Sequence, residues 1–310
     1  MWRWALVALP FATSAFASLV YRSNVRRRFP PVGCIVDAGG VKLHMEVTGS
    51  GPAIVLIHGA AGVLQDFPRV LRESLARTHT VIALDRPGHG YSSHGPRLLD
   101  VEGNVRAMRD AVRALGHERV TLVGHSYGAV LALRWALDAP EEVLAVVAVA
   151  PASAPYAGHA RWSALPIVWP VVGHAITWTL VLPLGALLAH FTRDRAAFPE
   201  RAPRGPATAS RAFPLIATQF RAFAENVQRV ARDVAEQVPR YAEAKVPLVI
   251  VAGDSDQITP PEIHAIPLPA RWGAKSELRL LPNAGHMLLR SHGDEVVAAI
   301  ARAVDLGHRP

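Results

Sequence analysis

The chain has 310 residues, half of them apolar, and a formal net charge of +8. This length is enough for one large α/β domain or for a domain that carries an insertion. The positive charge comes almost wholly from arginine, and no dense basic patch is interleaved with aromatic residues, which argues against nucleic acid as a partner. The single cysteine, Cys34, excludes an intramolecular disulfide.

The first predicted element is an uncharged, largely apolar stretch over residues 4–21, which four arginines follow at 22, 26, 27 and 28. Its length is typical of a membrane-spanning helix. The positive-inside rule would keep the arginines and the domain behind them in the cytoplasm. We therefore predict a membrane anchor with a basic flank over residues 1–28, and the membrane surface as a partner. The alternative is a signal peptide cleaved after Ala15-Phe16-Ala17, which would imply export.

Residues 29–151 are predicted to form the first part of an α/β core. A hairpin is expected over residues 34–47, because its two halves alternate around Asp37-Ala38-Gly39-Gly40. Continuous apolar runs are typical of strands buried on both faces, and they occur at residues 53–57, 80–84, 120–124 and 144–150. Helices are expected over residues 66–77 and 101–115, the second capped by Asp100 and ended by Gly116. Strands that alternate with helices predict a mostly parallel central sheet flanked by helices.

Residues 152–241 break this alternation, and we predict an inserted helical cap there. The apolar run 165–191 is interrupted by Pro166, Pro170 and Pro183, which favours the helices of a lid over a second membrane span. Residues 193–211, rich in proline and arginine, are expected to be a loop. Apolar residues then recur at spacings of three and four from Phe220 to Val234, as in an amphipathic helix. The sheet resumes at residue 247, so residues 242–310 form the second part of the core.

Polar residues follow the predicted strands directly, at His58, Asp85, Ser126, Asp254 or Asp256, and His286. Because the carboxyl ends of parallel strands meet at one edge of a sheet, these side chains should gather there. Ser126 lies in Gly-His-Ser-Tyr-Gly between a predicted strand and a predicted helix. This pattern places the serine on a tight turn with its hydroxyl projecting, while Gly124 and Gly128 let the strand and the helix pass closely. A serine nucleophile needs a base, and the base needs an orienting acid.

Five motifs in this order resemble those of the α/β-hydrolase fold superfamily, namely HGAAG, DRPGHGYS, GHSYG, GDSDQITP and NAGHM. The resemblance covers roughly residues 33–304, and the N-terminal region looks like that of the amino-terminally membrane-anchored bacterial members. It implies an α/β-hydrolase fold with an inserted helical cap. No histidine–carboxylate cluster has the spacing of a metal site, and we expect no cofactor.

The positions within these motifs imply the roles of individual residues. Ser126 is the implied nucleophile, His286 the base and Asp256 the acid; Asp256 fits the family pattern better than Asp254, because it directly precedes Gln257-Ile258. The implied oxyanion donors are the backbone amides of Tyr127 and Ala60, with Ala61 as the alternative to Ala60. The remaining polar residues of the motifs are expected to hold the loops together, and they are His58, Asp85, His89, Ser92 and His125.

The identity of the nucleophile selects the chemistry. Haloalkane dehalogenases and epoxide hydrolases of this fold use aspartate at the elbow, so a serine implies acyl transfer. We expect an esterase- or lipase-like hydrolase that cleaves carboxylic esters of small lipophilic substrates through an acyl-enzyme, with Trp162, Trp169 and Trp178 of the cap lining the acyl pocket. Other activities of the same triad remain open: an acyltransferase, a C–C hydrolase, a cofactor-free haloperoxidase, or a non-catalytic binding protein of this fold.

Overall fold

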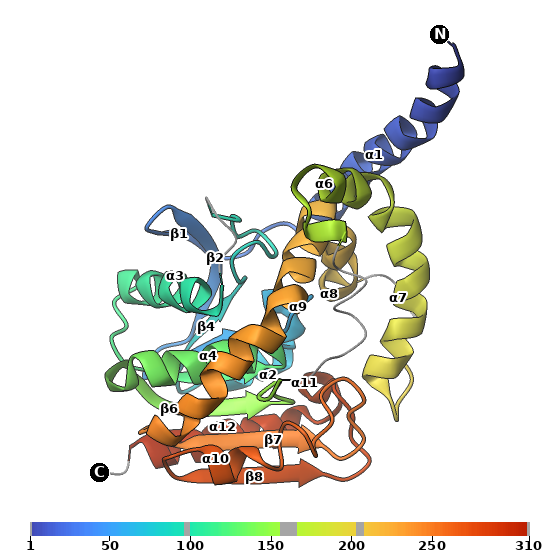
Figure 1. The fold of residues 1–310 in the computed structure, drawn as a ribbon. Helices are drawn as coiled ribbons and strands as arrows, with labels where there is room; N and C mark the ends of the chain where they lie inside the picture. The colour runs from blue at the N-terminus through green and yellow to red at the C-terminus, as the bar shows by residue number, and fades with distance from the viewer. Residues whose placement is uncertain (1, 96–99, 156–165, 203–207, 309–310) are drawn as a thin grey trace.

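An eight-stranded sheet lies at the centre of this computed structural model, which describes residues 2–95, 100–155, 166–202 and 208–308, with the backbone alone for residues 2–10, 170 and 188–193 (Figure 1). Across the sheet the strands are β1 (Cys34–Ala38), β2 (Val41–Thr48), β4 (Thr80–Leu84), β3 (Ala53–Ile57), β5 (Val120–His125), β6 (Val143–Val149), β7 (Leu248–Gly253) and β8 (Ser276–Leu281). The β1–β2 hairpin and the β2–β4 pair are antiparallel, and every pair from β4 to β8 is parallel. The predicted mostly parallel sheet is confirmed.

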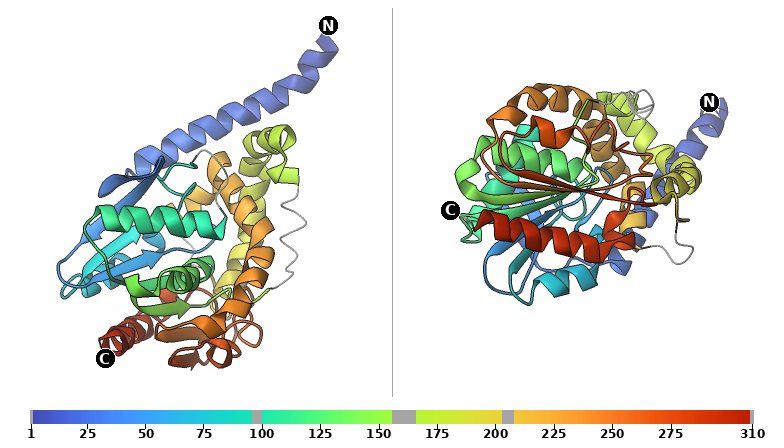
Figure 2. Two further views of the ribbon diagram at one scale, coloured as in Figure 1. Left: turned by 60° about the vertical axis from the view of Figure 1, so that its left-hand side comes forward. Right: turned by 90° about the horizontal axis from the view of Figure 1, so that it is seen from below.

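Helices cover both faces of the sheet. On one face lie α3 (Val101–Ala114) and α4 (Tyr127–Asp138), and on the other lie α2 (Arg69–Leu75) and α12 (Gly293–Gly307). Figure 2 shows α12, in red, and α4, in green, on opposite sides of the strands. Alternate residues of β3 point into the two apolar layers, Val55 into the first and Ile54 into the second. Burial on both faces explains why the parallel strands read as unbroken apolar runs.

The ends of α3 follow the local chemistry that the sequence indicated. The Asp100 side chain accepts a hydrogen bond of 2.8 Å from the Gly103 amide, which satisfies a first-turn donor. Gly116 follows the helix at a φ of 85°, a conformation that glycine adopts without strain. The remaining short elements of the core are η1 (Leu64–Asp66), η2 (Pro140–Glu142), α10 (Leu268–Arg271) and α11 (Leu288–Ser291).

The chain between β6 and β7 carries a set of helices that we call the inserted helices. They are α6 (Pro170–Thr179), α7 (Val181–Ala197), α8 (Ala209–Ala212), η3 (Phe213–Leu215), α9 (Ala217–Gln237) and η4 (Val238–Glu243). Pro170 begins α6 and Pro183 lies in the first turn of α7, where the missing amide hydrogen costs no helical bond. The expected loop over 193–211 is only partly confirmed, because α7 continues to Ala197 and α8 occupies Ala209–Ala212. Figure 1 shows α7 on the side toward which the arrowheads of β6, β7 and β8 point, while α9 runs diagonally across the view.

The predicted N-terminal membrane anchor is wrong. Across the described residues, no helix combines the length and the apolarity that crossing a membrane requires. Residues 4–21 instead belong to α1 (Trp2–Arg28), and the later turns of this helix pack against the protein. Ser18 is 4% exposed and its hydroxyl donates to the Trp178 carbonyl at 2.9 Å, while the Ser14 hydroxyl bonds the Thr179 carbonyl. Val25 is buried in a small apolar cluster with Phe213. The cytoplasmic placement of the domain was inferred from the arginines that follow the anchor, so it has no support without the anchor.

Candidate active site

Ser126 occupies the turn between β5 and α4. Its φ of 55° and ψ of −116° place a non-glycine residue in a region that side chains rarely adopt. The turn is held from both sides, because the Ser126 amide donates to the Val149 carbonyl at 2.9 Å and its carbonyl accepts from the Ala129 amide at 3.0 Å. The serine is partly exposed, whereas His125 and Tyr127 on either side are buried. The hydroxyl-bearing residue is therefore the accessible point of a rigid turn.

Gly124 and Gly128 permit this turn because the surrounding backbone lies too close to leave room for a side chain. A Cβ on Gly124 would lie 2.4 Å from the Gly128 carbonyl oxygen, and a Cβ on Gly128 would lie 2.1 Å from the Ile57 carbonyl oxygen. Carbon and oxygen atoms in ordinary contact are more than 3 Å apart, so neither position admits a larger residue without backbone movement. The close passage of strand and helix that the motif predicted is present.

Asp256 and His286 form a buried pair behind the turn. Nδ1 of His286 lies 2.8 Å from Oδ2 of Asp256. Oδ1 of the same carboxylate accepts from the amides of Ile258 and Thr259 at 2.8 and 2.9 Å. Burial by itself raises the pKa of Asp256, but the hydrogen bonds and charge of His286 and the bonds from Thr259 outweigh it and lower the pKa below its usual value. The carboxylate is thus held ionised beside the imidazole.

The neighbouring carboxylate, Asp254, is not part of this pair. Its Oδ1 accepts from the Ser255 hydroxyl at 2.8 Å, and the side chain is exposed at the start of the turn. The hydrogen bond from Ser255 lowers its pKa. Of the two candidates after β7, Asp256 is the one whose carboxylate meets the histidine.

His286 also lies against the elbow through His125. Nε2 of His125 is 3.0 Å from the His286 carbonyl oxygen, and the two rings are 5.0 Å apart between centroids. The loop after β8 therefore stands beside the residue that precedes Ser126. Burial, and then the charge of His286, lower the pKa of His125 to about 4. His125 is neutral at ordinary pH, and it donates from Nε2 to hold the His286 backbone in place.

Two polar residues at this site were missed from the sequence. The hydroxyl of Thr259 lies 2.8 Å from Oδ2 of Asp256 and 3.2 Å from Nδ1 of His286. His264 is 2% exposed, and its Nδ1 accepts from the Ala154 amide at 3.2 Å. Burial lowers the pKa of His264 to about 4. Thr259 lies within the GDSDQITP motif and could have been found as a hydroxyl three residues after the acid, whereas His264 carries no sequence signal.

The backbone amides proposed as oxyanion donors flank Ser126 from two elements. Tyr127 is the first residue of α4, where amides have no acceptor within the helix. The loop after β3 approaches from the other side, since a Cβ on Gly59 would lie 3.3 Å from Cβ of Ser126. Ala60 and Ala61 follow in this loop, Ala60 partly exposed and Ala61 exposed. The two elements that carry the amides expected as oxyanion donors therefore both adjoin Ser126.

Buried histidines hold the loop after β3 in place. His58 accepts from the Arg86 amide at its Nε2, 3.0 Å away, which leaves the proton on Nδ1 to bond the Gly59 carbonyl at 2.9 Å. Nε2 of His89 lies 2.7 Å from the Ala60 carbonyl. Burial, and then the charge of Arg86, lower the pKa of both histidines well below the usual value. The structural role expected of these residues is confirmed.

Asp85 organises the loop after β4 in the same way. Its carboxylate accepts from the amides of Leu64 and Tyr91 at 2.8 and 3.0 Å, and lies 2.7 Å from Nδ1 of His44. The Ser92 hydroxyl donates to the Asp85 carbonyl at 2.6 Å. Asp85 thereby connects its own loop, the DRPGHGYS segment, with the β1–β2 hairpin and with the loop after β3.

The sequence matches the alpha/beta hydrolase fold family over residues 52–292. The chain belongs to this family. A solved structure of a thermophilic esterase from Thermogutta terrifontis superposes with a TM-score of 0.71 at 18% identity, covering 89% of this chain and 99% of that one. At such identity the likeness supports the fold alone.

Two relatives show the chemical range of the family. The 2-hydroxy-6-oxo-6-phenylhexa-2,4-dienoate hydrolase of Burkholderia cepacia is 25% identical over 82% of this chain and 87% of its own length. The fluoroacetate dehalogenase of a Burkholderia species is 40% identical over 36% of this chain and 38% of its own length. In that relative and four others the alignment spans only 31 to 38% of the relative's length. Hydrolase activity is common to the family, while the substrate varies.

The close packing around Ser126 predicts that even an added methyl group at Gly128 strongly destabilises the fold. We expect Gly128→Ala to lower the free energy of unfolding by more than about 3 kcal/mol, because its Cβ must displace the β3 backbone. The matched control is Gly293→Ala at the start of α12, where a Cβ meets no atom within 4 Å. Urea denaturation of both variants is the measurement. Wild-type stability in Gly128→Ala would show that the strand and helix are not in contact.

The buried histidines predict acid sensitivity. The pKa of His264 is about 4 in the fold against an ordinary value of 6.5, so the fold favours its neutral form. Its contribution to stability is complete above about pH 6.5 and is lost as the pH falls toward 4, by up to about 3 kcal/mol. Asn at this position keeps an acceptor for the Ala154 amide and does not titrate. We expect urea denaturation to show a shallower loss of stability between pH 6.5 and 4 in His264→Asn.

The control for this experiment is His308→Asn, which changes a histidine exposed after α12. This variant should follow the wild type at every pH. Equal slopes in His264→Asn and the wild type would mean that His264 takes up its proton as readily in the fold as in the unfolded chain.

Proposed function

We propose that the protein is a serine hydrolase that cleaves carboxylic esters through an acyl-enzyme, with Ser126 as nucleophile, His286 as base and Asp256 as acid. The observation that carries the proposal is the strained, accessible serine between the two amide-bearing elements, near a histidine whose Nδ1 is bonded to the buried Asp256 carboxylate. A hydroxyl becomes nucleophilic when a neutral imidazole can take its proton. The buried carboxylate keeps the Nδ1 proton of His286 in place, so Nε2 is the free basic nitrogen.

The proposed reaction proceeds in two displacements. The Ser126 oxygen bonds to the ester carbonyl carbon while its proton passes to Nε2 of His286, and the carbonyl oxygen becomes an oxyanion between the amides of Tyr127 and Ala60. Collapse breaks the bond to the alcohol, which leaves with the proton from His286. Water then attacks the acyl-enzyme by the same route and releases the acid and the free serine.

The position and the apolar side chains of the inserted helices support the proposal that the substrates are lipophilic. Nη2 of Arg195 on α7 donates to the Gln257 carbonyl at 3.2 Å, next to Asp256, and a Cβ on Gly285 would meet the Phe198 carbonyl. The end of α7 therefore abuts the turns that carry the acid and the base. Large apolar side chains of this region are exposed, among them Trp169, Leu184 and Phe198. Trp162, expected to line the acyl pocket, lies outside the described residues. We propose that apolar side chains of the inserted helices receive the acyl chain.

A second candidate is hydrolysis of a C–C bond. It is favoured by the alignment with the dienoate hydrolase, which spans 82% of this chain. The two candidates differ in the substrate that is turned over. Purified protein assayed on p-nitrophenyl esters of graded chain length and on 2-hydroxy-6-oxo-6-phenylhexa-2,4-dienoate separates them. We expect ester turnover that increases with chain length, since each buried methylene contributes about 0.8 kcal/mol.

Substitution of the triad tests the chemistry. We expect Ser126→Ala and Asp256→Asn to lower kcat by about three orders of magnitude or more, and Ser126→Ala to abolish labelling by a fluorophosphonate. The matched control is Asp254→Asn, which changes the adjacent exposed carboxylate and should retain kcat. Near-full activity in Ser126→Ala, or equal losses in the two aspartate variants, would contradict the assignment.

A further inference from the structure

Arg86 lies where the loop after β3, the elbow and helix α9 meet. It is fully buried. Its Nη2 donates to the carbonyls of Gly59 and Ala60, each at 2.9 Å, and its guanidinium carbon is 4.8 Å from the centroid of the Tyr127 ring. Its Nη1 donates to Oδ1 of Asn226 on α9 at 2.9 Å. One side chain thus contacts both elements that supply the proposed oxyanion donors and also an inserted helix.

The two carbonyl contacts determine where the amides of this loop point. A peptide bond is planar and trans, so its carbonyl and its amide hydrogen point in opposite directions. Holding the Gly59 carbonyl toward Arg86 directs the Ala60 amide away from Arg86, and holding the Ala60 carbonyl does the same for the Ala61 amide. Nη2 of Arg86 therefore contributes to orienting both possible donors of the loop, together with His58 and His89, which bond the same two carbonyls.

The position of Arg86 in turn depends on Asn226. The groups that accept from its guanidinium in hydrogen bonds between described residues are neutral: the carbonyls of Gly59 and Ala60 and the Asn226 amide oxygen. A buried charged donor that loses an acceptor loses much of what offsets its desolvation, and it moves toward other acceptors. Burial already lowers the pKa of Arg86 to about 10. Removal of the Asn226 oxygen should therefore shift the guanidinium, and the two carbonyls with it.

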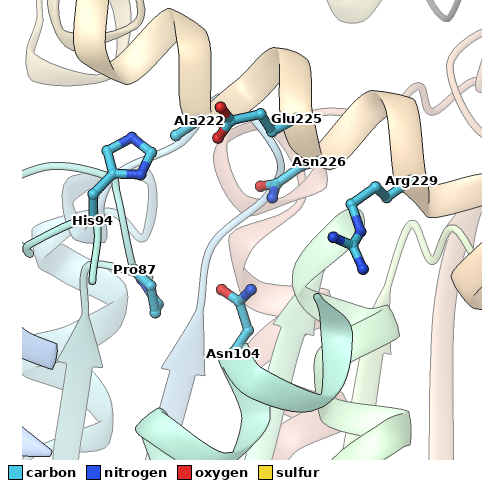
Figure 3. Close-up of a pocket in the computed structure, with 7 residues that line it drawn as sticks. All are labelled: Pro87, His94, Asn104, Ala222, Glu225, Asn226 and Arg229. Atoms are coloured by element: carbon cyan, nitrogen blue, oxygen red, sulfur yellow. The ribbon is translucent and has the colours of Figure 1, made fainter. Parts of the chain in front are cut away.

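Asn226 is 8% exposed, so its hydrogen bond to Arg86 is shielded from bulk water. A small pocket opens under α9 at this point, and its walls include Pro87, Asn104, Asn226 and Arg229. Figure 3 shows Asn226 projecting from α9 toward Asn104 across this pocket.

We propose that Arg86, held by Asn226, is a positioning residue that orients the oxyanion loop, so that the seating of α9 on the core sets the rate of the acyl-transfer step. This inference rests on the proposed function. The inference gives helix α9 a role in stabilising the transition state, through the hydrogen bond of Asn226 to Arg86. The contact is made more than a hundred residues away from the loop along the chain.

Helix α9 supplies a matched control in Gln219. Its side chain is as buried as that of Asn226 and makes two hydrogen bonds to Gly90, accepting from the amide at 2.7 Å and donating to the carbonyl at 2.8 Å. Gln219 joins α9 to the loop after β4 and makes no contact with Arg86 among the hydrogen bonds between described residues. Gln219→Met therefore loosens α9 without disturbing the guanidinium.

The experiment compares Asn226→Leu, Asn226→Asp and Gln219→Met. Each is assayed for kcat and KM on a p-nitrophenyl ester and for inhibition by an alkyl trifluoromethyl ketone, to which the serine adds to form a tetrahedral oxyanion. We expect Asn226→Leu to lower kcat and to weaken the inhibitor by a similar factor of about 10 to 100, less than outright loss of an oxyanion donor. KM should change little. Asn226→Asp keeps an acceptor and should restore most of kcat.

Gln219→Met should lower the melting temperature as much as Asn226→Leu while kcat and inhibition stay within about twofold of wild type. Asn226→Ala serves if Asn226→Leu does not fold. Equal kcat and inhibitor affinity in the Asn226 and Gln219 variants would overturn the inference and leave the serine mechanism intact. A wild-type protein without ester turnover or fluorophosphonate labelling would remove the proposed function, and this inference with it.

Discussion

The site depends on the close passage of three backbone segments around Ser126. The carbonyl of Ile57 at the end of β3 lies where a side chain of residue 128 would stand, and β5 and α4 cross with only glycine between them. These close contacts and the two backbone hydrogen bonds of Ser126 hold the serine in its strained conformation. Strain of this kind persists only where the surroundings over-determine it. The parallel sheet provides those surroundings, since β3, β5 and β6 all end at the same edge.

Around that turn several buried histidines are held neutral, while the Asp256 carboxylate and the Arg86 guanidinium carry charge. Burial lowers the pKa of His58, His89, His125 and His264, so these rings act as hydrogen-bonding struts. Asp256 stays ionised because four hydrogen bonds converge on it. Arg86 stays charged among neutral acceptors. In a low-dielectric site, hydrogen-bond donors aimed at a developing charge stabilise it more than they would in water, which is what the proposed oxyanion position requires.

The inserted helices and α1 show how apolar surface is used outside the core. The end of α7 reaches the acid turn through Arg195, and α9 reaches the oxyanion loop through Asn226 and Arg86. The α1 helix packs on the same set of helices through Ser18 and Val25. The contact of α7 with the acid turn, the seating of α9 and the docking of α1 therefore share one structural unit, which is attached to the sheet at several separate points.

Several features could be predicted from the sequence, because apolar runs, turn residues and motif spacing are local properties. They are the strands, the cap of α3, the mostly parallel sheet and the order of the candidate residues Ser126, Asp256 and His286. The packing of α1 on the inserted helices could not be predicted, since the composition of residues 4–21 does not show which distant segment the helix contacts. Thr259 and His264 at the acid, and the link from Asn226 through Arg86 to Gly59, join residues far apart in the chain. Contacts of this kind leave no periodic pattern in the sequence. Only the packing of α9 and the loops onto the carboxyl edge of the sheet decides them.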